Sequence, residues 1–60
     1  MNPDNQLQAI SSLRRRDGLN EEDESDILTW CERCGPDFDT SRLSEKSIER
    51  IRVIFMKHYV

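Results

Sequence analysis

Cys31 and Cys34 are the residues whose type and spacing come closest to a chemical site. Their C-x-x-C spacing, directly after Trp30, is used by redox-active dithiols and by zinc-binding sites. A redox-active pair needs its first cysteine at the start of a helix, where the dipole lowers the thiol pKa, whereas this pair falls at the end of an expected helix. We therefore expect reduced thiols that pack in the core as small hydrophobic groups.

A zinc site and a catalytic site both lack residues that they would need. A structural zinc ion takes four ligands, and besides the cysteine pair the chain offers one histidine, His58. Completing the set would need a carboxylate such as Asp37 or Asp39, or a second chain, so a metal shared between two chains stays open. One histidine, no glycine-rich loop and carboxylates concentrated at one helix start do not form a catalytic set, so we expect no cofactor and no enzymatic activity.

An acidic block is flanked by two mildly basic segments. The block, residues 19–35, carries six carboxylates against Arg33 alone, a net charge of −5, while the segments on either side are each +1. Acidic side chains favour the start of a helix, so we interpret the block as a solvated helix start. The basic residues are candidates for phosphate contacts. They are Arg14, Arg15, Arg16, Lys46, Arg50 and Lys57.

Length and composition limit the chain to one small all-α domain over residues 1–60. A chain of 60 residues, 35% of them apolar, is long enough for a single core only. Its longest apolar run has four residues, Val53–Met56, which is far too short to span a bilayer. The first six residues contain neither a basic nor an apolar leader region. We therefore expect a cytoplasmic protein that does not contact a membrane.

Three helices are expected, over residues 3–16, 21–34 and 45–59. Each of them follows a residue whose side chain can cap a helix start, and each of the first two ends at a glycine. No segment alternates apolar and polar residues long enough to predict a strand. The expected caps are Asn2, Asn20 and Ser44, and the glycines are Gly18 and Gly35.

Apolar side chains recur at helical spacing in all three segments and predict a three-helix core. The first segment has a thin stripe, so we expect the second and third helices to supply most of the core. Phe38, in the connection over residues 35–43, is expected to close one end of it. The predicted core-facing residues are Leu7, Ile10 and Leu13, then Ile27, Leu28, Trp30, Cys31 and Cys34, and then Ile48, Ile51, Ile54 and Phe55.

The third segment carries more apolar surface than one face needs. Val53 falls between the basic residues, Met56 lies on the flank, and Tyr59 follows near the end. Two partner helices in so short a chain can hardly cover all of it, and an exposed apolar patch of this kind marks an interface. We therefore expect a docking surface there, and self-association as one way of covering it.

Several motifs from Leu19 onward form a pattern that resembles a known class of proteins. They are Leu19–Glu22, Ile27–Leu28 and Leu43–Lys46, the last leading to isoleucines at 48, 51 and 54 and to a lysine at 57. Over residues 19–58 the chain resembles small all-α accessory proteins of temperate, lambda-like bacteriophages. It departs from their pattern at Ser47, where a glutamine is commoner. The resemblance implies a protein made early in infection that binds host proteins or forms small oligomers, with no catalytic residues.

Two functional hypotheses follow. The first is a non-enzymatic interaction module that binds a host or phage protein, or a second copy of itself, through Val53, Met56 and Tyr59, with help from Arg14–Arg16. The alternative is a small DNA-binding transcriptional regulator that uses Arg14–Arg16 together with the basic residues of the third helix, Lys46, Arg50 and Lys57. Salt separates them, because phosphate-driven binding weakens steeply as salt rises and apolar docking hardly responds.

Overall fold

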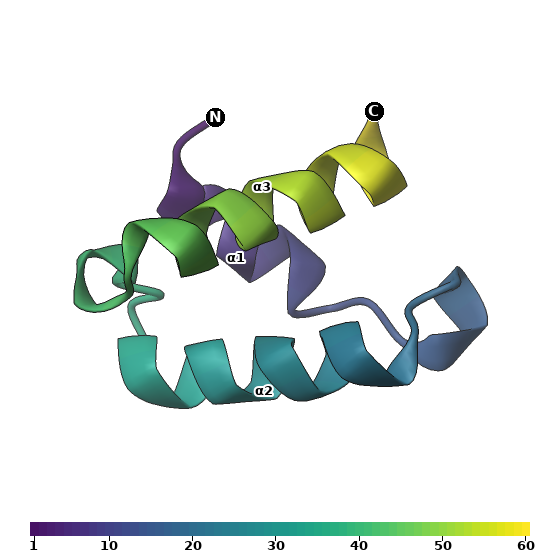
Figure 1. Cartoon of the computed structure of the whole chain (residues 1–60), viewed down its shortest axis with the longest axis horizontal. Helices are drawn as coiled ribbons and strands as arrows, with labels where there is room; N and C mark the ends of the chain where they lie inside the picture. Colours follow the sequence, from purple (N-terminus) through teal and green to yellow (C-terminus); the bar gives the residue numbers. More distant parts are fainter.

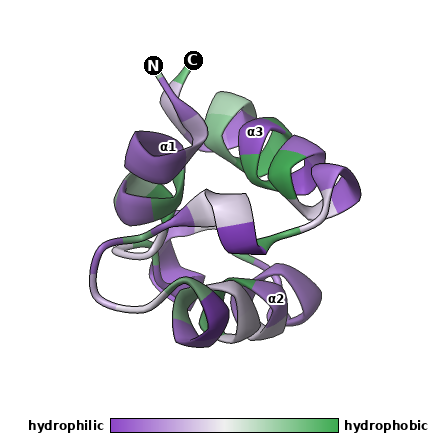
Figure 2. Cartoon of the chain, turned by 90° about the vertical axis from the view of Figure 1, so that its left-hand side faces the viewer, coloured by the Kyte–Doolittle hydropathy of each residue, from purple (hydrophilic) through white to green (hydrophobic).

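The computed structural model describes all residues, 1–60, and confirms a small all-α domain with three helices and no strand. The chain runs through α1 (Pro3–Ile10), the 3₁₀ turn η1 (Arg15–Asp17), α2 (Glu21–Cys34), the 3₁₀ turn η2 (Thr40–Arg42) and α3 (Glu45–Tyr59) (Figure 1). α1 and α3 lie together on one side of the molecule, and α2 lies on the other (Figures 1 and 2).

The second and third helices begin and end where the sequence predicts. Asn20 caps α2, because its side-chain oxygen accepts a hydrogen bond of 2.8 Å from the backbone N–H of Asp23. Ser44 caps α3 in the same way, accepting from the N–H of Ser47 at 3.2 Å. α2 stops at Gly35, whose φ of 76° lies in the left-handed region that glycine adopts without a steric penalty.

The first helix is much shorter than predicted. α1 ends at Ile10, and the prediction of one helix over 3–16 is wrong. The hydroxyls of Ser11 and Ser12 donate to the carbonyls of Gln8 and Ala9, at 2.6 and 2.8 Å, so side chains compete with the backbone for the last carbonyls of the helix. The chain then turns, and η1 forms with the N–H of Arg14 donating to the Asp17 carboxylate.

Eight apolar residues are buried, and every helix contributes to this core. α2 and α3 supply five of them, as expected, but α1 makes the most extensive helix–helix contact, which is with α3. Phe38 packs against the core from the connection between α2 and α3, as predicted. The buried set is Leu7, Ile10, Leu19, Ile27, Trp30, Cys34, Ile51 and Ile54.

Leu28 does not belong to the core. The inward stripe of α2 runs through Asp23, Ile27, Trp30 and Cys34, while Leu28 is 64% exposed. It sits about 100° round the helix from Ile27, on the edge of the predicted apolar arc that the other helices do not reach. The predicted burial of Leu28 is therefore wrong. Ile48 is likewise only half-buried.

Polar contacts join segments that are distant in the sequence. The hydroxyl of Tyr59 donates to the carbonyl of Ala9 at 2.9 Å, which ties the end of α3 to α1. The Asp4 carboxylate accepts from the backbone N–H of Thr40 at 3.0 Å and from its hydroxyl, which ties α1 to η2. None of the helices has both the length and the apolar character that crossing a bilayer requires.

Candidate protein-docking surface

The two cysteines are free thiols in the last turn of α2, at its C-terminal end. Cys34 is 2% exposed and Cys31 is half-buried. Burial raises the pKa of both thiols, and the neighbouring Cys31 and the carboxylates of Asp39 and Asp4 raise the pKa of Cys34 further. A raised pKa keeps a thiol protonated and a poor nucleophile, which is the opposite of a redox-active pair. Both cysteines pack on the core side of α2, as predicted.

The side chains that could hold a metal ion do not lie close together. The structure brings together no group of three or more histidine, cysteine, aspartate or glutamate side chains that could hold a metal ion. The Nε2 atom of His58 is buried without a hydrogen-bond partner.

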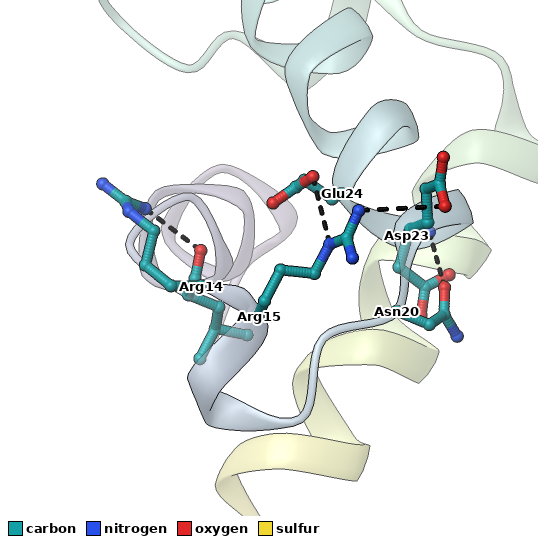
Figure 3. Close-up of polar contacts among 7 residues, drawn as sticks. Arg14, Arg15, Asn20, Asp23 and Glu24 are labelled. Carbon is teal, nitrogen blue, oxygen red and sulfur yellow. Dashed lines mark hydrogen bonds and ion pairs between the residues drawn. The ribbon is translucent and has the colours of Figure 1, made fainter.

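The arginines at 14–16 have three different environments. Arg14 donates to the carbonyls of Ser11 and Leu13, at 3.2 and 3.0 Å. Arg15 turns to the start of α2, where its Nε lies 3.3 Å from a Glu24 carboxylate oxygen (Figure 3). Arg16 is exposed and forms no ion pair. Of the three side chains, only Arg15 is ion-paired with a carboxylate.

Arg50 is also placed differently from the prediction. It was expected beside Lys46 and Lys57 on the solvent side of α3, but its guanidinium reaches α2. There Nη2 lies 2.9 Å from Asp23 Oδ1 and 3.2 Å from Asp26 Oδ2. The guanidinium carbon lies 5.9 Å from the centroid of the Trp30 ring, a cation–π contact. Arg50 is thus part of the contact between α2 and α3.

The outer face of α3, which we define as Lys46, Val53, Met56 and Lys57, is a surface that the chain leaves uncovered. Val53 and Met56 are 52% and 47% exposed. They lie about 200° and 140° round the helix from the fully buried Ile51, so they point away from the core. Their predicted exposure is confirmed.

The charged residues around Val53 and Met56 differ in whether they form an ion pair. Lys46 and Lys57 are exposed and form no ion pair, whereas Arg52 is bound to Glu49 by an N–O contact of 2.6 Å. Tyr59, predicted as part of the same surface, is 47% exposed, but its hydroxyl is engaged with α1 and its ring stacks on Phe55 at 5.0 Å between centroids. Its polar end therefore serves the fold.

A recess on α2 was not predicted. It has a volume of about 230 Å³ and opens beside the exposed side chain of Leu28. No periodicity signal could have identified it, because its floor depends on where the α1–α2 connection lies against α2. Its lining consists of Leu13, Leu19, Ile27 and Leu28 with Ser11, Arg14 and Glu24.

The chain matches no protein-family model, no curated protein and no solved structure. A function for it therefore has to follow from its own surfaces. Of the residues singled out in the sequence, Lys46, Val53, Met56 and Lys57 come together on one helix face, while Arg15, Arg50 and Tyr59 make contacts within the fold.

Proposed function

We propose that this chain is a non-enzymatic interaction module that binds another protein through the outer face of α3. The observation that carries the proposal is the half-exposed pair Val53 and Met56, which lies on the side of α3 opposite the core. Apolar side chains that no other part of the chain can reach are stabilised by a partner that removes them from water.

The charges around the pair support an acidic partner. Lys46 and Lys57 bracket Val53 at distances of about 10 and 6 Å along the helix axis, and neither has an ion-pair partner within the chain. The matching surface is an amphipathic helix with an apolar side chain between two carboxylates. Such a surface is small, so the complex belongs among weak or transient interactions.

The resemblance to accessory proteins of temperate phages supplies the proposed biological setting. In that setting the partner is a protein of the bacterial host or of the phage, met in the bacterial cytoplasm, and binding modulates a process of the host or of the phage. Nucleic acid is the alternative partner. It is less favoured, because Arg15 and Arg50 are ion-paired with carboxylates of α2.

A designed helical peptide tests the proposed chemistry directly. The peptide carries one leucine, with a glutamate seven residues before it and another four residues after it, in an alanine-rich background unrelated to this chain. We expect saturable binding, measured by calorimetry and by NMR shifts of the Val53 and Met56 methyl groups. The double variant Val53→Ser/Met56→Ser should bind about tenfold more weakly or worse.

The control is Gln8→Ala, an exposed position on α1 that lies outside the proposed surface. It should bind like the wild type. Absence of saturable binding to the wild type, or equal binding by the double variant, would contradict the proposal. A DNA duplex is titrated in parallel, and duplex binding that weakens steeply with salt would favour the regulator instead.

A further inference from the structure

We infer that one partner of the outer face of α3 is a second copy of this chain, which presents the outer side of its α2. The inference rests on the proposed function and identifies a surface with the required chemistry. α2 (Glu21–Cys34) carries six carboxylates and one arginine, whereas α3 (Glu45–Tyr59) carries four basic residues and two acidic ones. The two helices of one molecule therefore have opposite charge.

The matching surface on α2, which we call the outer face of α2, consists of Glu21, Leu28 and Glu32, which lie within about 40° of one another round the helix. Leu28 is 64% exposed, and the recess of about 230 Å³ opens beside it. Glu21 and Glu32 are exposed. Glu32 forms no ion pair, and Glu21 has one contact of 3.8 Å, with the exposed Arg15. An exposed apolar side chain thus lies between two exposed carboxylates on one side of α2.

The spacing of the two faces agrees in one orientation. On α3, Val53 lies seven residues after Lys46 and four before Lys57, and on α2, Leu28 likewise lies seven residues after Glu21 and four before Glu32. Two helices packed in parallel with Leu28 beside Val53 therefore bring each lysine level with a glutamate. The antiparallel pairing sets Leu28 level with Arg50 instead, which is bound to carboxylates of its own α2.

The contact joins two different faces of the protein. α2 and α3 lie on opposite sides of the molecule (Figures 1 and 2), so a molecule that presents α3 to one neighbour keeps its own α2 face free for another. Such a heterologous contact produces a ring or an open chain of copies, in contrast to the two-fold dimer formed when a face pairs with itself.

Analytical ultracentrifugation of the full chain across concentration and salt is the experiment. We expect the average mass to rise above that of the 7.1 kDa monomer with increasing concentration. High salt should weaken the association, because lysine–glutamate pairs at exposed sites are screened. Lys57→Glu should shift association to about tenfold higher concentration, and mixing it with Glu32→Lys should restore it.

A mixture of two defective variants distinguishes the heterologous contact from other arrangements. Val53→Ser/Met56→Ser removes the α3 face and keeps the α2 face, while Leu28→Ser does the reverse at an exposed position that does not affect the core. Each variant alone should remain monomeric. Mixed together, they should form a one-to-one pair and nothing larger, because the pair has no second matching face to offer.

Two results would overturn the inference and leave the proposed function standing. One is a wild type that stays monomeric at every concentration while it still binds the designed acidic peptide. The other is a Leu28→Ser variant that associates as well as the wild type, which would assign the contact to α3 faces alone. A wild type that associates with itself but does not bind the designed peptide would instead reject the proposal that other proteins bind to this face through an acidic helix.

Discussion

α3 is held on its two sides by different kinds of contact. Towards α1 it packs Ile51 and Ile54 against a helix whose Leu7 and Ile10 are fully buried, and that contact is the most extensive in the molecule. Towards α2 it relies on Arg50, whose guanidinium joins two carboxylates and a tryptophan ring. The same helix therefore has an apolar contact on one side and a charged contact on the other.

The difference shows that the stability of the domain and the orientation of its helices depend on different kinds of contact. Burial of apolar side chains scales with area and has no direction, so the apolar contacts of α3 contribute stability without fixing an orientation. Hydrogen-bonded ion pairs have fixed geometry and a smaller net contribution, so the pairs of Arg50 with Asp23 and Asp26 fix the rotation of α2 together with its buried apolar stripe. That rotation explains why Asp23 is buried and Leu28 is exposed.

The largest effect is expected where the apolar contact is opened. Ile51→Ala removes a fully buried side chain and should lower the free energy of unfolding by about 2–5 kcal/mol, a large part of the stability of so small a domain. Urea denaturation followed by circular dichroism measures it. Val53→Ala, on the exposed side of the same helix, is the control and should change stability by less than about 0.5 kcal/mol. Equal losses for the two variants would contradict the division between the faces of α3.

An intermediate effect is expected where the charged contact is opened. Asp23→Ala removes the closer and more buried partner of Arg50 and should cost about 1.5–3 kcal/mol. Asp26→Ala removes the more exposed partner, at 3.2 Å, and should cost less than about 1 kcal/mol. A double-mutant cycle with Arg50→Ala checks that the losses come from these pairs. A greater loss from Asp26→Ala would reverse the assigned roles of the two carboxylates.

The smallest effect is expected from the single polar bond within the apolar contact. Tyr59→Phe removes the hydrogen bond to the Ala9 carbonyl and keeps the stacking on Phe55. We expect a loss of about 0.5–1.5 kcal/mol, towards the lower end because the tyrosine is partly exposed and water can replace it. Thermal unfolding of the two proteins side by side measures the difference. A loss as large as that of Ile51→Ala would show that the polar bond, not burial, holds α1 to α3.

The helix bounds could be predicted where the signals are local. Asn20 and Gly35 delimit α2, and Ser44 begins α3, because caps and glycines act within a few residues of themselves. The end of α1 could not, because Leu13 continues the helical spacing while the hydroxyls of Ser11 and Ser12 end the helix. Spacing does not report which hydrogen bonds the side chains form.

The candidate surface could be predicted in part for a related reason. Val53 and Met56 lie opposite Ile51 on the helix, so their exposure follows from periodicity alone. The inward turn of Arg50 and the outward turn of Leu28 follow from the angle at which α2 meets α3, and a single sequence does not specify this angle. Tertiary packing here overrides the apolar arc of an isolated helix.

The partnership of α1 with α3 has a consequence for how the protein is made. Tyr59 and Ala9, which bond across this contact, are 50 residues apart, and the apolar side chains of α1 meet theirs near residues 51–54. While the ribosome is adding the intervening residues, α1 lacks the helix with which it makes its most extensive contact, and α2 lacks the ion pairs with Arg50. Contacts between such distant residues form late and slowly. Until α3 has been completed, the apolar side chains of α1 that pack against it therefore stay in contact with water.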